Sequence, residues 1–365
     1  MKFIIVILKE EKIMNNQEGA ACSSVGMSAE KSGKLFSHFK GPAFYKPDNR
    51  VIHPFNVIVQ KEISDQVRSW RFVILVIIIS LTCLGSMYTA LSNIKDAIKP
   101  NDPEGTFLFL KIFTVSDGIM PSFVVFIGFL GPLLGISLGF DTINSEQNNR
   151  TLSRILSQPI HRDYLLNAKF VAALTVISVM FFALGFLVMG FGLITIGIPP
   201  TPDEFLRIIF FIIISIVYVA FWLNLSIFFS VIFRQPATSA LSGIAIWLFF
   251  SVFYSMIVDL IMKGMVPQGL ATENQVINFE MMRLNLLRLS PSELFSDATT
   301  TLLMPGVRSL GPLSMIQLIG TIPGPLPLGQ SLLLVWPQIT GLIAGTIICF
   351  ILSYVFFMRK EIRSR

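Results

Sequence analysis

Six long apolar runs dominate the pattern of hydrophobic and polar positions along the chain. They lie at about 72–92, 118–140, 169–195, 207–233, 237–261 and 332–358. Each is close to the roughly 20 residues that a helix needs to cross the hydrocarbon core of a bilayer. None has a charged side chain near its centre, where charges often mark an ion or proton pathway. The pattern predicts an all-α integral membrane protein with six transmembrane helices, and it disfavours a transporter driven by protons or sodium.

The segment before the first run mixes apolar and charged positions. The segment extends from about residue 51 to residue 71. In it the apolar Ile63 follows the charged Lys61 and Glu62, and Trp70 lies near the start of the span. This mixture is typical of an amphipathic helix at a membrane interface. We therefore predict a helix here; the alternative is a plain cytoplasmic lead-in to the first span.

The most polar stretch between two runs extends from Gly139 to Lys169. Leu152, Ile155 and Leu156 recur at i, i+3 and i+4, which is one face of a helix. Pro159 must end that helix, because its ring removes a donor and restricts the preceding residue. The spacing predicts a short amphipathic helix of about four turns; an ordinary solvated loop with accidental periodicity is the alternative.

Charged residues in the same loop support a helix over 144–158. Glu146 lies four residues before Arg150, the favourable order for a helical ion pair. Asp163 is placed to help start the next helix.

The segment 263–331 lies between the fifth and sixth runs. Its pattern predicts short helices on the extracytoplasmic side of the membrane. Residues 278–289 form an amphipathic pattern, and Ser290 and Pro291, with Glu293 following, are a helix-start signal. The second helix should end near Met304. We expect these helices to dip into the outer leaflet and cap a cavity.

Basic residues determine the predicted orientation. They gather before the first span (Lys61, Arg68, Arg71), after the second (Arg150, Arg154, Arg162, Lys169), after the fourth (Arg234) and at the end (Arg359, Lys360, Arg363, Arg365). With an even number of spans all four groups lie on one face, which is then the cytoplasmic face. Both termini are therefore expected in the cytosol.

Small and amide residues inside the runs have two interpretations. Gly128, Gly131, Gly135 and Gly139 in the second span form one smooth face, which suits close helix packing or a position near a transport path. The side-chain amides of Asn224 and Gln338 are expected to hydrogen-bond between helices more often than to bind cargo.

The loop between the second and third runs resembles that of permease subunits of type 2 ATP-binding-cassette transporters. The matching positions are Asp141, Glu146, Thr151, Leu152, Pro159, Ile160, Arg162 and Lys169. The family commonly has glycine where Arg150 stands, and charges where Gln147, Asn148 and Asn149 stand. The resemblance implies that this loop holds a coupling helix that docks onto a separate ATPase, and that these eight residues, together with Arg150, form the coupling and docking site.

Two further segments carry the resemblance. The run Lys61–Ser69 resembles the elbow helix that precedes the first span in this family. The string Leu289–Leu294, with Thr299–Leu302 further on, resembles the matching segment of permeases in nitrous-oxide-reductase maturation cassettes. The resemblance implies six spans over residues 51–365, a second permease subunit, identical or related, and export across the cell membrane.

Composition agrees with a membrane protein. Of the 365 residues, 53% are hydrophobic and only 14% charged, against about 25% charged in soluble domains. The net charge of +6 follows from basic residues on the cytoplasmic face, so no nucleic-acid partner is expected. Three scattered cysteines and three isolated histidines predict neither a disulfide framework nor a metal site. Residues 1–50 are polar enough to predict a disordered cytoplasmic segment, with no cleaved signal.

Motifs for catalysis are missing from the sequence. Gly33-Lys34 is followed by Leu35 and lacks the upstream glycine of a phosphate-binding loop. No His-Glu-x-x-His or Gly-x-Ser-x-Gly motif occurs. We expect no catalytic residue and no cofactor on this chain, with ATP and magnesium on the partner subunit; substrate-binding residues stay unassigned. The alternative to a permease is a structural membrane subunit or a membrane-embedded enzyme without a transport role.

Overall fold

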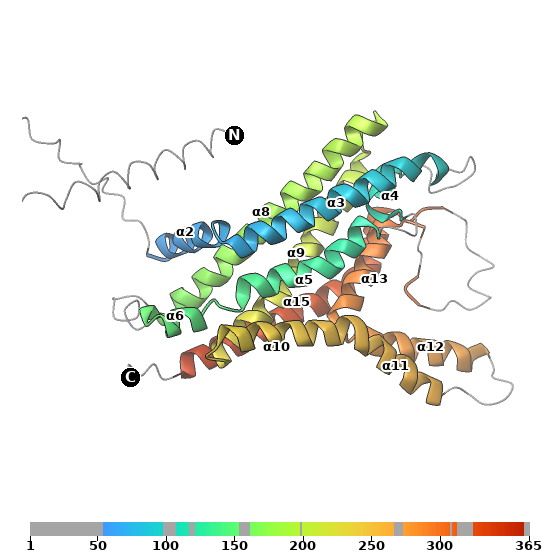
Figure 1. Cartoon of the computed structure of the whole chain (residues 1–365). Coiled ribbons are helices and arrows are strands. Elements are labelled where there is room, and N and C mark those ends of the chain that lie inside the picture. The colour runs from blue at the N-terminus through green and yellow to red at the C-terminus, as the bar shows by residue number, and fades with distance from the viewer. Residues whose placement is uncertain are drawn as a thin grey trace, which may run out of the picture. The chain divides into compact units, whose positions relative to one another are not determined.

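The computed structural model describes residues 54–97, 107–116, 121–152, 161–197, 199–265, 273–306, 309–311 and 324–360 (Figure 1). Every regular element in these ranges is a helix. They are α2 (Pro54–Val67), α3 (Trp70–Ala97), α4 (Leu108–Thr114), α5 (Phe123–Gly139), α6 (Asn144–Asn148), α8 (Arg162–Ile196), α9 (Pro202–Ile232), α10 (Pro236–Leu248), the π-helix η2 (Phe249–Phe253), α11 (Tyr254–Gly264), α12 (Glu273–Leu287), α13 (Pro291–Leu303) and α15 (Leu328–Arg359). The expected disordered segment 1–50 lies outside the described residues.

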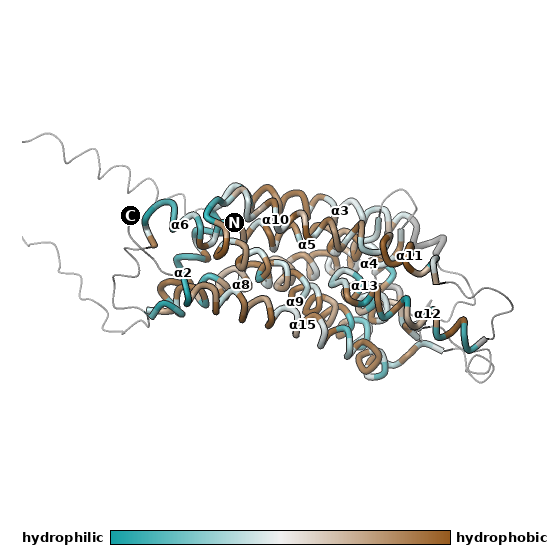
Figure 2. Tube along the Cα trace, turned by 90° about the horizontal axis from the view of Figure 1, so that it is seen from below, coloured by the Kyte–Doolittle hydropathy of each residue, from teal (hydrophilic) through white to brown (hydrophobic). Residues whose placement is uncertain are grey.

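Among the described residues, six stretches are long and apolar enough to cross a membrane, which confirms the predicted all-α membrane architecture. They are Trp70–Ser92, Phe123–Asn148, Arg162–Ile196, Pro202–Ile232, Pro236–Gly264 and Leu328–Arg359. In Figure 2 the apolar residues run along the helices, and hydrophilic residues gather where α2 and α6 lie. The end of α15 lies at this same end of the bundle, opposite α4 and α12.

The third and fourth helices begin earlier than the apolar runs predicted. α8 starts at Arg162, with Asp163 in its first turn as predicted, although the apolar run begins only near residue 169; its polar first turns pack against α2. α9 starts at Pro202 rather than near 207. There Thr201 and Glu204 form a reciprocal capping box, which satisfies free backbone donors of the first turn.

The glycine face of α5 packs against α9 at very short range. A Cβ atom at Gly135 would lie 2.7 Å from the Val219 carbonyl oxygen, and one at Gly139 would lie 2.8 Å from that of Leu223. The Ser226 hydroxyl donates to the Ile136 carbonyl across the same contact, over 3.0 Å. The predicted packing role of these glycines is confirmed. Asn224 likewise donates from α9 to the Thr346 carbonyl of α15, over 3.5 Å.

A buried arginine connects helices at the end of the bundle away from α2 and α6. Apolar periodicity did not reveal it. Arg207 on α9 is fully buried. Its guanidinium donates to the carbonyls of Leu302 (2.9 Å) and Leu326 (2.7 Å), and it pairs with Asp203 over 2.8 Å. A buried guanidinium is stable only when such partners surround it. Arg207 thereby ties α9 to α13 and to the chain that leads into α15.

The helices between the fifth and sixth spans are confirmed, with two corrections. α12 begins at Glu273, five residues before the predicted 278, and ends at Leu287. Ser290 is the N-cap of α13 and Pro291 its first residue, as predicted. However, the predicted capping box does not form, because the Ser290 hydroxyl donates to the Phe250 carbonyl of η2, over 3.4 Å.

Candidate coupling interface

The helix before the first span lies alongside the start of α8. The rings of Phe55 and Tyr164 meet edge to face with centroids 5.9 Å apart. Seven residues further along α2, Glu62 accepts a hydrogen bond from Lys169 of α8. These two contacts are in the same order on both helices, so α2 and the first turns of α8 run in the same direction.

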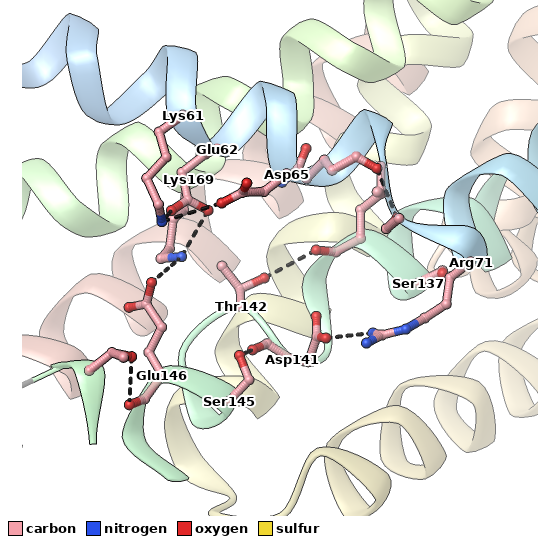
Figure 3. A pocket seen from close by; sticks show the side chains of 14 residues that line it. Lys61, Glu62, Asp65, Arg71, Ser137, Asp141, Thr142, Ser145, Glu146 and Lys169 are labelled. Atoms are coloured by element: carbon pink, nitrogen blue, oxygen red, sulfur yellow. Dashed lines mark hydrogen bonds and ion pairs between the residues drawn. The ribbon is translucent and has the colours of Figure 1, made fainter. Parts of the chain in front are cut away.

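Lys169 is the centre of a buried ion network (Figure 3). Its ammonium nitrogen lies 2.9 Å from Glu62 Oε2 and 2.9 Å from Glu146 Oε1. The exposed fractions are 4% for the Lys169 side chain, 9% for Glu62 and 13% for Glu146. Removing one partner from such a site leaves an uncompensated charge, at a cost of about 3–5 kcal/mol. The network joins α2, α6 and α8.

The outer part of the network adds charges from α2. Lys61 lies 3.1 Å from Glu62 and 3.4 Å from Asp65. Burial alone would raise the pKa of Glu62, but the charges and hydrogen bonds of Lys169 and Lys61 outweigh it and lower that pKa. For Lys61, burial would lower the pKa, and the two neighbouring carboxylates more than offset this and raise it. Glu62 is therefore held in its ionised form.

A second ion pair connects the beginning of α3 with the end of α5. Arg71 donates to the carboxylate of Asp141, and its guanidinium carbon lies 4.9 Å from the ring centroid of Phe140. The Lys169 network and the Arg71–Asp141 pair line opposite sides of a cavity of about 520 Å³ between α2, α5 and α6.

α6 is anchored to α9 through its backbone. The Ser230 hydroxyl accepts hydrogen bonds from the amides of Ile143 (2.9 Å) and Asn144 (3.2 Å). These are donors at a helix N-terminus that local side chains leave unsatisfied. Asn148, at the other end of α6, donates to the Arg234 carbonyl over 3.0 Å.

The prediction of one continuous helix over 144–158 is wrong. α6 ends at Asn148, and Arg150 has a φ of 58°, in the left-handed region that a right-handed helix cannot contain. Helical structure resumes at Thr151, whose hydroxyl donates to the Glu146 carbonyl over 3.2 Å. The carboxylate of Glu146 pairs with Lys169 of α8. The predicted Glu146–Arg150 pair stays a prediction. Ile155 and Leu156 lie outside the described residues.

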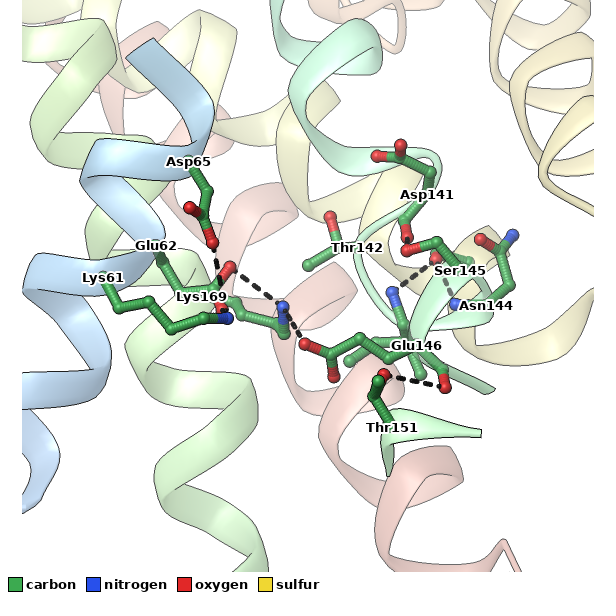
Figure 4. A network of polar contacts seen from close by, with 12 residues as sticks. Lys61, Glu62, Asp65, Asp141, Thr142, Asn144, Ser145, Glu146, Thr151 and Lys169 are labelled. Atoms are coloured by element: carbon green, nitrogen blue, oxygen red, sulfur yellow. Dashed lines mark hydrogen bonds and ion pairs between the residues drawn. The ribbon is translucent and has the colours of Figure 1, made fainter. Parts of the chain in front are cut away.

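The structure divides the predicted coupling residues into two groups. Figure 4 shows four of them: Asp141, Glu146, Thr151 and Lys169. Arg150, Thr151 and Arg162 are exposed. The other described members face inward: Asp141 toward Arg71, Glu146 and Lys169 toward each other, and Leu152, which is 4% exposed, into the core. Pro159 and Ile160 lie outside the described residues.

Sequence reasoning missed Glu62, Arg71 and Ser230 as members of this site. Glu62 and Arg71 carry a visible signal, as charges next to a span, but nothing local in the sequence pairs them with residues in a later loop. Ser230 carries no signal, because a serine within an apolar run usually bonds to its own helix.

Comparison with known families identifies the class of protein. Residues 56–362 match the family described as ABC-2 family transporter protein, so the chain belongs to this family. It is a transmembrane subunit of an ATP-binding-cassette transporter, a multi-pass membrane protein and not an enzyme by itself. A comparison with curated proteins finds no match.

Proposed function

We propose that this chain is the permease of an exporter, powered by ATP that a separate ATPase subunit hydrolyses with magnesium. Two permease subunits, identical or related, would form the path in the cell membrane, with both termini in the cytosol. The motif Leu289–Leu294 supports a relationship to the permeases of nitrous-oxide-reductase maturation cassettes. One observation carries the coupling proposal: the helices that hold the buried Lys169 network also present exposed residues. Exposed Arg150 and Thr151 follow α6, which carries Glu146, and exposed Arg162 starts α8, which carries Lys169.

The contacts define how movement would spread from a docked ATPase. A push on α6 reaches α8 and α2 through the Glu146–Lys169–Glu62 chain. It reaches α9 through Ser230, and α3 through the Asp141–Arg71 pair. These links are polar and directional, so they transmit a tilt better than sliding apolar contacts do. Exposed residues would dock the ATPase, and inward residues would transmit its movement.

The test is capture of a co-expressed, tagged ABC ATPase from the same organism by the full chain in nanodiscs. Arg162→Glu should weaken capture by at least tenfold, because it reverses an exposed charge at the docking face. Lys263→Glu is the matched control, an exposed lysine at the opposite end of the bundle. Equal capture by both variants would exclude docking at Arg162. If folded wild-type protein captures no ATPase, the proposal fails and a structural subunit becomes the better reading.

A further inference from the structure

The fifth span consists of two halves with different partners. α10 packs against α9 and α5. There the rings of Trp247 and Phe129 meet with centroids 4.8 Å apart, and a Cβ atom at Gly243 would lie 3.2 Å from Ile136. α10 therefore belongs to the bundle.

The outer half, α11, is attached to α12. Tyr254 donates to the Leu286 carbonyl over 2.7 Å, and Asp259 pairs with Arg283 over 2.8 Å. The order of these contacts makes the two helices antiparallel. Among the described elements, α12 packs chiefly against α11, and α11 packs chiefly against α12 and η2. Figure 1 shows the pair projecting from the bundle at the end opposite α6.

Both connections of this pair to the bundle meet at one place. The chain enters the pair through η2 and returns through Ser290 into α13. Ser290 donates to the Phe250 carbonyl of η2 over 3.4 Å, and the hydroxyls of Ser251 and Ser292 lie 3.4 Å apart. A π-helical turn is a common site of helix bending, because it interrupts the regular hydrogen-bond ladder.

Tyr218 holds this joint against the bundle. Its hydroxyl donates to the Gly128 carbonyl of α5 over 3.1 Å and lies 3.3 Å from the Ser292 hydroxyl. Its ring is fully buried and stacks on Phe295 of α13, with centroids 4.4 Å apart. The hydroxyl is thus a polar link between the bundle and the joint, beside the ion pair of Arg288 with Asp297 of α13, over 3.0 Å.

We propose that α11 and α12 form one hinged flap, which swings about η2 and Ser290–Ser292 and is held by Tyr218. The swing is a property of this chain alone. Its use, to open and close the outer end of the transport path, rests on the proposed function.

The swing is tested by spin-label distances in the full chain in nanodiscs, with the native cysteines replaced. One label pair joins the flap at Leu260 to α15 at Leu333, and the control pair joins α3 at Leu81 to Leu333; all three side chains are exposed. In Tyr218→Phe combined with Ser292→Ala, the flap pair should gain a second or broader distance population while the control pair stays unchanged. An unchanged flap pair, or equal broadening of both pairs, would overturn the hinge.

The gating role is tested separately in the assembled transporter. A disulfide between Ser251→Cys and Ser292→Cys locks the joint, whereas the control, Ser251→Cys combined with Ser292→Ala, loses the same two hydroxyls but cannot form the cross-link. Oxidation should abolish ATP-driven turnover in the first variant, with recovery on reduction, and should leave the second active. Full turnover with the joint locked would overturn gating, and the ATPase-capture result would be unaffected.

Discussion

Lys169 donates to Glu62 over 2.9 Å, although 107 residues separate the two in the chain. The same ammonium group lies 2.9 Å from Glu146. One buried charge therefore fixes the helix before the first span, the loop after the second span and the start of the third span relative to each other. The arrangement makes α2 part of the candidate coupling interface and more than a lead-in to the first span.

Replacing Lys169 with methionine should destabilise the protein strongly. The substitution keeps the length of the side chain but leaves Glu62 and Glu146 without their shared cation. We expect a loss of about 3–5 kcal/mol, as for other broken buried ion pairs. The measurement is the midpoint of thermal unfolding in detergent, followed by fluorescence-detected size exclusion.

Lys61→Met is the matched control, because the Lys61 side chain is 58% exposed. An exposed pair contributes about 0–1 kcal/mol, so this variant should unfold close to the wild type. Adding Glu62→Gln to Lys169→Met should recover part of the loss. Equal midpoints for the two single lysine variants would contradict the central role of Lys169.

Arg150 occupies a backbone conformation that suits glycine. A left-handed conformation costs a non-glycine residue roughly 1–2 kcal/mol, and Arg150 has a φ of 58°. We expect Arg150→Gly to equal or exceed the wild type in thermal stability, and Arg150→Val to fall below it, since β-branched residues avoid positive φ. A valine variant as stable as the glycine variant would show that the loop does not need this conformation.

The sequence was sufficient for the architecture because bilayer thickness imposes it. Apolar runs near 20 residues long give the number of spans without any knowledge of tertiary contacts. Helix ends are harder, because polar first turns such as 162–168 in α8 lie outside the apolar run and pack against α2. α4 and the bend at η2 left no periodic signal.

The candidate site was predicted in position but not in geometry. Local spacing predicted a helix in this loop, and the resemblance to type 2 permeases implied its candidate residues. Spacing paired Glu146 with Arg150 but gave no sign that the Glu146 carboxylate pairs with Lys169 from another helix. The left-handed backbone at Arg150 breaks the helix that periodicity favoured, and Glu146 contacts a residue of another helix. Neither effect is contained in an i, i+4 pattern.

Gly135 should tolerate no side chain, because α9 backbone lies directly against it. A Cβ atom there would meet the Val219 carbonyl at 2.7 Å and the Leu223 nitrogen at 3.0 Å. We expect Gly135→Ala to destabilise the protein by about 1–3 kcal/mol, the usual range for overpacking. Gly190→Ala is the control, since a Cβ atom there meets nothing within 4 Å, and it should be neutral or stabilising. Similar losses in both variants would exclude close α5–α9 packing as the cause.

Glu293 should make stability depend on pH in the opposite sense to Glu62. Burial, and then the neighbouring carboxylates of Asp297 and Asp259, raise the pKa of Glu293 above its usual value of 4.5, although Arg283 opposes them. Its ionised form is therefore disfavoured in the folded state, and folding stability increases as pH falls through the raised pKa toward 4.5. The pKa of Glu62 is lowered, so its contribution is complete above 4.5 and is lost only as pH falls below that value.

Two glutamine variants separate these effects. Glu293→Gln should raise the unfolding midpoint at pH 7. The gain in the free energy of unfolding should be less than about 1 kcal/mol, because the site is partly exposed and screened. The gain should shrink as pH approaches 4.5. Glu62→Gln should lower the midpoint at pH 7, and its deficit should persist down to pH 4.5. Midpoints measured between pH 7 and pH 4.5 decide the matter: a Glu293→Gln gain independent of pH would mean that the improvement comes from packing and not from removal of a disfavoured charge.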